Sequence, residues 1–484
     1  MSTAASVKAV PQSDTPRPSL DETLGAMEEP SHALARFAAN LRHEDIPANI
    51  RSRARHHLLD AIGIALASTK YDFAQRTLNA IAGLGGAGPV PVIGMPARLS
   101  ARDAAVVNGL LCHGLDFDDT HLGGVVHPTA SALPAALSAA MHVGAGGRDL
   151  LTAYIIGVEA SARLGAVVKG AFHQIGFHPT GVVGAFGCAL TAGVLFGLSE
   201  RELVHAQGIA LSLASGSLEF LEDGAWNKRV HPGWAAAAGI TAAALAKQGF
   251  KGASRPYIGR FGLYRSHLGP LAEGCDYKLA TAGLGESWEI LRTAIKPFPA
   301  CHFTHGCIDA ALRLRNDGVE AGAIDAIEAL VPGEVVKTVC EPEANKKRPA
   351  NSYDAQFSIP FLVAAALVRG RLTLAELEES ALSDPQILAL ADRVGYRVDP
   401  DSPFPRAYSG EVRIALKSGK RIGAREEINR GAPDRPLTEA DIVAKYRANA
   451  AVAVSPATAA RIEEAVLRLD ETQDLDGFAA RIAG

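Results

Sequence analysis

The sequence predicts a mainly α-helical protein with a large all-helical domain and a smaller α+β domain. Hydrophobic residues make up 48% of the chain but aromatic residues only 6%, and 48 glycines accompany a heavy use of alanine. This composition suits closely packed helices better than a β-sandwich. Long apolar segments with helical spacing fill the first half, and strand-like alternation begins near residue 295. A chain of 484 residues is too long for one ordinary core, so at least two domains are expected.

The expected helices of the first domain follow from apolar spacing and from helix-start signals. Residues 31–66 have helical spacing, and a Gly/Pro-rich break follows at 83–96. Ser100 is the expected N-cap of the next helix, with Asp103 three residues further on. Five apolar helices should then form a bundle, at residues 128–143, 149–164, 179–196, 200–213 and 232–248.

The character of the sequence changes near residue 295. IEALVPGEVVKTV and GYRVD are strand-like, and YSGEVRIALKSGKRIGAREEI alternates around Ser418-Gly419 as a β-hairpin does, while a helix is expected at 359–368. Helical spacing returns near Leu437, so the last helices are expected to pack back on the first domain. The first 30 residues lack a basic region followed by an apolar one, and they have the composition of a disordered tail. The predicted division is 1–30 tail, 31–294 helical domain, 295–430 α+β domain and 431–484 C-terminal helices.

Charge and cysteine content exclude several classes of partner. The formal net charge is only -4, with 48 basic and 52 acidic residues spread along the chain, so neither nucleic acid nor an anionic membrane is an expected partner. The six cysteines form no CxxC pair, which predicts reduced thiols and a cytoplasmic protein. The uncharged segment 181–198 nearly has the length of a membrane span, but its five glycines favour a buried core helix.

The stretch from Cys112 to Pro134 (CHGLDFDDTHLGGVVHPTASALP) carries three carboxylates and three histidines between apolar segments. Polar groups are costly in such surroundings unless they have partners or a chemical task. If residues 113–120 form a helix or a helical turn, Asp116, Asp119 and Thr120 lie on one face and Asp118 lies on another. Two adjacent carboxylates that face a shared cavity should separate their proton affinities. Such a pair serves general acid/base chemistry. Helix capping is one alternative, and a metal site built from His113, Asp116 and His121 is another.

Three histidines, at positions 127, 178 and 231, each precede a proline at the expected start of an apolar helix. Helix N-termini attract anions through free N–H groups and the helix dipole. Lys228 and Arg229 stand just before the third pair. If the three helix ends converge, they form a pocket for a ligand with several carboxylates. The alternative is three ordinary capped helices with partly buried histidines.

A further cluster, IKPFPACHFTHGCIDA, opens the second domain, where a cleft between domains is expected. Cys301 could serve there as a nucleophile, or as a zinc ligand with His302 and His305, although no second Cys/His cluster supports zinc. The sequence has no GxGxxG after a strand, no P-loop and no GxSxG elbow, so dinucleotide, nucleoside triphosphate and α/β-hydrolase chemistry are unsupported.

Several spaced motifs together resemble the MmgE/PrpD family, which contains 2-methylcitrate dehydratase and cis-aconitate decarboxylase. The matching segments are LLDAIGIALAS, HGLDFDDTHLGGVVHPTASALPAAL, GFHPTG, DGAWNKRVHPGWAAAAG, IKPFPACHFTH and AQFSIP. The resemblance implies a helical domain built from N- and C-terminal parts, an α+β lid domain, a homodimer, and a site between the domains without metal or organic cofactor.

The resemblance also implies site residues. Five are expected to be catalytic, namely Asp116, Thr120, His127, His178 and Lys228. Residues expected to contact substrate are Arg229, His231, Cys301, His302 and His305. We predict that His127 or His178 moves a proton next to a substrate carboxylate, while Lys228 stabilises the charge that develops and Asp116 with Thr120 orients the reacting groups.

The expected activity is that of a lyase for a small di- or tricarboxylate, with 2-methylcitrate-like dehydration first. A cis-aconitate-type decarboxylation and an iminodisuccinate-type epimerisation are alternatives. Cys301 stands where the decarboxylases resemble one another in having histidine, and the loop LGGVVHP lacks the longer Trp-containing insertion of the strict 2-methylcitrate dehydratases. Rivals from other classes are a non-catalytic polycarboxylate-binding protein and a metal-dependent hydrolase.

Overall fold

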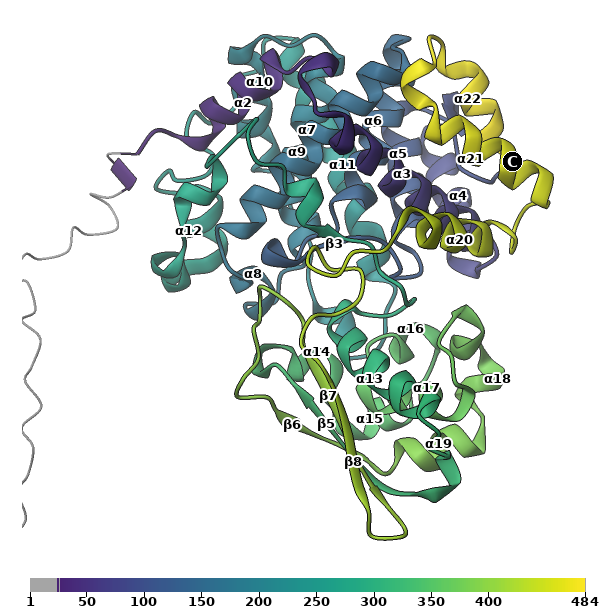
Figure 1. The fold of residues 1–484 in the computed structure, drawn as a ribbon. Helices are drawn as coiled ribbons and strands as arrows, with labels where there is room; N and C mark the ends of the chain where they lie inside the picture. The colour runs from purple at the N-terminus through teal and green to yellow at the C-terminus, as the bar shows by residue number, and fades with distance from the viewer. Residues whose placement is uncertain (1–23, 26, 484) are drawn as a thin grey trace, which may run out of the picture.

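The computed structural model describes residues 24, 25 and 27–483. Figure 1 shows a large helical region and, beside it, a smaller region with helices and one main sheet, which confirms the predicted fold class. The predicted disordered tail lies largely outside the described residues. Ordered packing nevertheless begins before residue 31, because Leu24 is buried and Glu29 Oε1 accepts a hydrogen bond from the Tyr257 backbone N at 2.9 Å.

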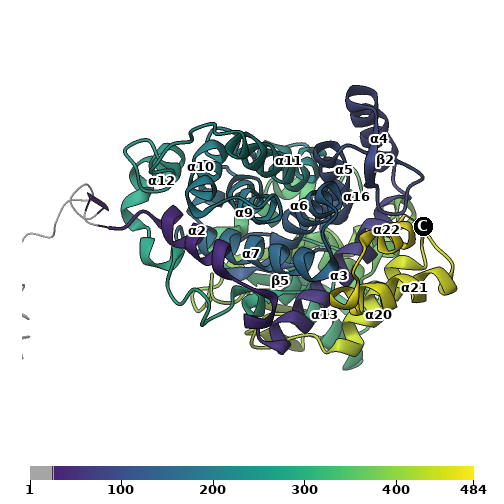
Figure 2. The same ribbon diagram turned by 90° about the horizontal axis from the view of Figure 1, so that it is seen from above.

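The centre of the helical region is an uncharged, buried helix, α9 (Pro179–Leu195). Figure 2 shows its neighbours around it, namely α6 (Pro128–Val143), α7 (Gly147–Ala166), α10 (Glu200–Ala210) and α11 (Asn227–Lys247). Small residues permit this packing: a Cβ on Gly187 would lie 2.5 Å from the Gly157 carbonyl of α7. Among the described helices, none combines the length and apolar character that crossing a membrane requires.

The first part of the chain differs in detail from expectation. The segment expected to be helical from residue 31 to 66 is two helices, α2 (Pro30–Asn40) and α3 (Ala48–Ser68), with Pro47 immediately before the second. A further helix, α4 (Asp72–Gly85), was not predicted. Strand β1 (Ala87–Pro91) lies in the Gly/Pro-rich break and pairs antiparallel with β2 (Arg98–Leu99), which follows the break. Ser100 does cap α5 (Ala101–His113), since its Oγ accepts from the Asp103 backbone N.

The prediction for one helix of the bundle is wrong in a way that matters for the site. Helix α11 begins at Asn227 and not at residue 232, so Pro232 lies inside the helix. A proline there loses one backbone hydrogen bond, which a long helix tolerates near its N-terminus. Lys228, Arg229 and His231 therefore lie in the first turns of α11 and not ahead of it.

The α+β region is built on a four-stranded sheet with strand order β6-β5-β7-β8. Strand β5 (Ile324–Val331) is parallel to β6 (Val394–Val398) and antiparallel to β7 (Gly410–Leu416), which forms the predicted hairpin with β8 (Arg421–Glu426). Gly419 in its turn has φ 84°, a conformation that favours glycine. The helices of this region are α13 (His305–Asn316), α14 (Val336–Val339), α15 (Glu343–Lys347), α16 (Ser352–Ala355), α17 (Ile359–Arg369), α18 (Glu379–Leu382) and α19 (Pro385–Ala391).

The C-terminal helices return to the helical region, where Figure 1 shows them in yellow beside the purple N-terminal helices. They are α20 (Glu439–Ala450), α21 (Pro456–Leu467) and α22 (Leu475–Ile482). Helix α20 packs on α3, where Gly63 leaves room for Tyr446: a Cβ would lie 2.9 Å from the Tyr446 ring. The predicted domain boundaries themselves stay predictions.

Candidate active site

The acidic stretch after α5 is a loop and not the helical turn that we expected. Helix α5 ends at His113, and Asp116 has φ 48°, in the left-handed region where a non-glycine residue is strained. The loop leads into strand β3 (Thr120–His121), which pairs with β4 (Thr293–Ala294). Successive strand residues point to opposite sides, so Thr120 faces a cavity while His121 Nε2 lies 2.9 Å from Glu289. His113, Asp116 and His121 are therefore not brought together as one metal site.

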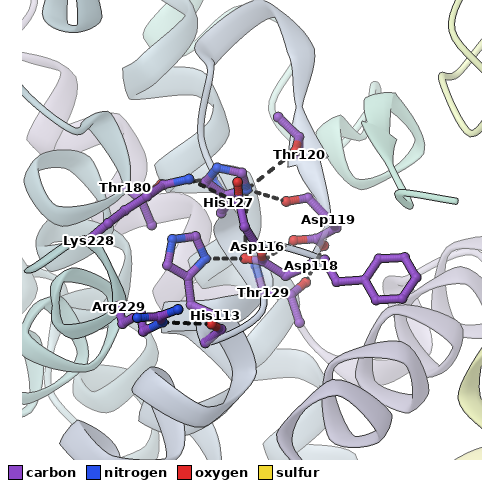
Figure 3. A network of polar contacts seen from close by, with 12 residues as sticks. His113, Asp116, Asp118, Asp119, Thr120, His127, Thr129, Thr180, Lys228 and Arg229 are labelled. Carbon is purple, nitrogen blue, oxygen red and sulfur yellow. Dashed lines mark hydrogen bonds and ion pairs between the residues drawn. The ribbon is translucent and has the colours of Figure 1, made fainter. Parts of the chain in front are cut away.

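Asp116 lies between two ammonium groups. Its Oδ1 accepts hydrogen bonds from Lys228 Nζ at 2.8 Å and from Lys296 Nζ at 2.9 Å. Figure 3 shows Lys228 directed at this carboxylate. Burial alone would raise the pKa of Asp116, but the two lysines hold it well below its ordinary value. Burial opposes the charge of Lys296, yet Asp116 and Asp118 raise its pKa. Asp116 is therefore an ionised carboxylate that offsets the charge of two buried ammonium groups.

The neighbouring Asp118 behaves in the opposite way. Burial raises its pKa, and its Oδ2 lies 2.7 Å from His113 Nδ1 (Figure 3). The pKa values of Asp116 and Asp118 are therefore shifted in opposite directions. The spacing predicts such a separation for the pair on one helix face, Asp116 and Asp119, and that stays a prediction. Asp119 has a structural role, because its carboxylate accepts from the backbone N of Thr129 at 3.2 Å, at the start of α6. Asp119 therefore satisfies one of the N–H groups at this helix end.

His127 is held in one tautomer. Its Nδ1 lies 2.7 Å from the Asp119 carbonyl oxygen, which can only accept, so Nδ1 carries the hydrogen and Nε2 has the free lone pair. The backbone N of His127 donates to Thr180 Oγ1 at 3.0 Å, which fixes the residue at the N-cap of α6. Burial keeps the pKa of the ring well below 6.5. His127 is therefore a neutral, oriented base at pH 7.

His178 occupies the N-cap of α9, as predicted. Its Nδ1 lies 3.0 Å from Nδ1 of His231, and its buried Nε2 has no hydrogen-bond partner among the residues that the structure describes. Burial, and then the charge of Lys228, keep the pKa of His178 well below 6.5. The ring of His113 stacks on it with the centroids 5.5 Å apart. A second unpaired imidazole nitrogen is thus available next to Lys228.

These groups border one small cavity between the helical and the α+β regions. All five predicted catalytic residues line it: Asp116, Thr120, His127, His178 and Lys228. The remaining wall is largely apolar or neutral and consists of Val125, His173, Leu218, Phe220, Leu221, Cys301, His302, Phe303, Thr338, Phe357 and Tyr408. The cavity therefore combines a cationic floor with an environment of low polarity.

The residues expected to bind substrate divide into two groups. Cys301 and His302 line the cavity, and burial raises the pKa of the Cys301 thiol to about 11, so it is protonated at neutral pH. Arg229 stacks between the rings of Phe73 and Tyr353 and does not line the cavity. His231 does not line the cavity, but its Nδ1 lies 3.0 Å from Nδ1 of His178, which does. His305 does not line it either, and its Nε2 lies 3.1 Å from the Ala300 carbonyl oxygen.

Two functional groups were missed by sequence reasoning. Lys296 was noted in the IKPFP motif without a role, and His113 was considered only as a metal ligand. Ligand atoms of His113, Asp116, Asp118 and His127 do lie within 4.8 Å of one another. Asp116 Oδ1 already accepts from two ammonium groups, and the Nδ1 atoms of both histidines are committed to internal partners. The Asp116 carboxylate of this group is therefore already paired with lysine ammonium groups.

Comparison with known proteins identifies the class. Residues 32–272 match the MmgE/PrpD N-terminal domain and residues 298–471 match the MmgE/PrpD C-terminal domain. The chain belongs to the MmgE/PrpD family, as the sequence motifs indicated.

Named relatives cover most of the chain. Cis-aconitate decarboxylase of Aspergillus terreus is 27% identical over 463 residues, 91% of this chain and 93% of the relative. Cis-aconitate decarboxylase of Homo sapiens is 30% identical over 403 residues, 80% of each chain. The 2-methylcitrate dehydratase of Escherichia coli is 25% identical over 414 residues, 76% of this chain and 79% of the relative. These relatives are carboxy-lyases and hydro-lyases, and the prediction of a lyase of this family is confirmed.

Proposed function

We propose that the protein is a cofactor-independent lyase that acts on a small tricarboxylate by proton transfer at the carbon next to a carboxylate. The main support is the pairing of Asp116 with Lys228 and Lys296, beside the neutral His127 and His178 in the wall of one cavity. The names of the relatives, which act on cis-aconitate or 2-methylcitrate, support a tricarboxylate as substrate.

The chemistry follows from where charge develops. Removing a proton next to a carboxylate moves negative charge onto the oxygens of that carboxylate. An ammonium group has three N–H donors, and one on Lys228 is used by Asp116, so others remain to bind these oxygens. His127 Nε2 or His178 Nε2 takes the proton, since both rings are neutral. Thr120 Oγ1, 3.3 Å from His127 Nδ1, orients the base or a substrate hydroxyl.

Two reactions fit this site. In dehydration a histidine takes a proton, the C–O bond breaks, and the hydroxide leaves as water with a proton. Histidines kept neutral by burial favour this base-first reaction, and we place it first. In decarboxylation the C–C bond breaks, the electron pair stays on the substrate, and a histidine must deliver a proton. The greater coverage by relatives named cis-aconitate decarboxylase favours this second candidate.

The decisive experiment follows isotopes. The protein is incubated in deuterated water with 2-methylcitrate, citrate, cis-aconitate and dicarboxylate controls, and NMR follows loss of water, loss of CO₂ and deuterium incorporation. Lys228→Ala and His178→Ala should each lower turnover by on the order of a hundredfold. Lys247→Ala, an exposed position on the same helix as Lys228, should not.

Several outcomes would contradict the proposal. Near-normal turnover in Lys228→Ala and His178→Ala would remove the mechanism. Binding of a tricarboxylate without any isotope exchange or product would favour a non-catalytic binding protein. Activity that a chelator abolishes and a divalent ion restores would favour a metal-dependent hydrolase.

A further inference from the structure

The backbone carbonyls of the acidic loop, residues 114–119, are held by side chains from other segments of the chain. Five of the six carbonyls are occupied in this way, and the donors come from α11, the IKPFP segment, the AQFSIP segment, α20 and the start of α6. The pairs are Gly114 O with Arg229 Nε at 2.8 Å, Leu115 O with Gln356 Nε2, Asp116 O with Lys296 Nζ at 2.8 Å, Phe117 O with Lys445 Nζ at 2.8 Å, and Asp119 O with His127 Nδ1 at 2.7 Å.

Gln356 differs from the other four donors because it joins two segments of the site at once. It lies in the AQFSIP motif of the α+β region and is buried, with 3% of its surface exposed. Its Nε2 donates to the carbonyls of Leu115 and of Pro299, the latter at 2.9 Å. The backbone carbonyl of Gln356 accepts a hydrogen bond from the backbone N of Cys301 at 2.8 Å. Gln356 therefore ties the acidic loop to the segment that follows Lys296.

The loop needs such a restraint. Asp116 is held at φ 48°, a conformation that costs about 1–3 kcal/mol for a non-glycine residue and persists only where its surroundings enforce it. The carbonyl of the preceding residue, Leu115, is the one that accepts a hydrogen bond from Gln356. A displacement of about 1 Å at a reacting group can lower a rate by roughly a hundredfold. Gln356 itself does not line the cavity, so any effect on turnover must act through other residues.

We propose that Gln356 is a positioning residue for the reaction: by holding Leu115 and the 299–301 segment together, it keeps the Asp116 carboxylate between Lys228 and Lys296. This inference rests on the proposed lyase function. Under this proposal a residue of the α+β region helps to set the positions of the charged groups that the helical region presents to the substrate.

The test compares two buried glutamines. Gln356→Met removes both donors without adding charge. Gln207→Met is the matched control, because Gln207 is also buried and its Nε2 donates to two carbonyls, those of Ser31 at 3.0 Å and Leu203 at 3.1 Å, at a position that does not line the cavity. We expect kcat to fall about tenfold or more in Gln356→Met with KM within about threefold, and kcat to stay unchanged in Gln207→Met. Backbone amides of residues 115–121 should exchange hydrogen faster in Gln356→Met only.

Each result decides the matter. A folded Gln356→Met protein with unchanged kcat, or with a lower thermal midpoint as its only defect, would overturn the proposal. If the variant does not fold, Gln356→Asn, whose amide is too short to reach both carbonyls, replaces it under the same expectations. If the native enzyme converts no tricarboxylate, the proposed function fails, and hydrogen exchange at 115–121 still shows whether Gln356 holds the loop.

Discussion

Replacing Asp116 with asparagine should destabilise the protein by leaving two lysines buried without their carboxylate. Lys296 is fully buried and Lys228 is 5% exposed. Asparagine can still accept a hydrogen bond, so the loss is mainly one of charge. Removing one partner of a buried ion pair costs about 3–5 kcal/mol, which corresponds to a fall of roughly 3–5 °C in the thermal midpoint of a chain of this size.

A second substitution tests this reasoning. Asp116→Asn raises the net charge of the cluster by one, and the double variant Asp116→Asn/Lys296→Met returns it to the native value. The double variant should therefore regain part of the lost thermal midpoint, although neither variant should turn over substrate at the native rate. Scanning calorimetry of the native protein, both single variants and the double variant supplies the complete cycle. A double variant whose loss equals or exceeds the sum of the single losses would refute the charge-balance account.

The pH dependence has a definite sign. The two lysines depress the pKa of Asp116 in the folded protein, so its stabilising effect is complete above the unfolded value of about 4 and is lost only as the pH falls below it. The difference in thermal midpoint between the native protein and Asp116→Asn should therefore be constant from pH 6 to 8. A difference that changes steadily in this range would point to another titrating group.

Three further predictions concern groups around the same cavity. Because burial keeps the pKa values of His127 and His178 well below 6.5, kcat/KM should be level from about pH 6.5 to 8 and fall only in more acidic solution; a half-maximal point at 6.5 would contradict this. Because burial raises the pKa of the Cys301 thiol to about 11, iodoacetamide at pH 7.5 should leave turnover unchanged under conditions in which it alkylates free glutathione, the control thiol. Rapid inactivation of the enzyme would contradict this prediction. Lys445→Met removes the ammonium that restrains the pKa of Asp60, which burial raises to about 6, so the loss in thermal midpoint should grow from pH 5 to pH 8 as the carboxyl must ionise; an equal loss at both pH values would refute it.

The sequence predicted the helical framework and the identity of most cavity residues because those signals are local. Apolar periodicity located the helices of the bundle, and the His-Pro pairs located the N-caps of α6 and α9. The same local rule failed for His231-Pro232, since helix-forming residues ahead of the proline extend α11 backward. Proline signals the first turn of a helix only when the preceding residues do not favour a helix themselves.

The contacts that organise the site could not be predicted, because they join residues far apart in the sequence. Lys296 and Asp116 are separated by 180 positions, and nothing local to either indicates the other. A helical acidic stretch would use its carbonyls in the helix hydrogen bonds, but five of the six carbonyls at 114–119 accept from side chains instead. In a strand at Thr120–His121 the two side chains point to opposite sides. No local signal in the sequence indicates this strand, because it forms by pairing with the distant residues Thr293–Ala294.

The holding of the acidic loop by distant side chains also sets the order in which the site can form during synthesis. The loop leaves the ribosome early, but the side chains that fix it follow at positions 229, 296, 356 and 445. Residues 32–272, which match one family domain by themselves, contain only the first of these four. The helices of the nascent chain can therefore pack before Lys296 is available to bind Asp116.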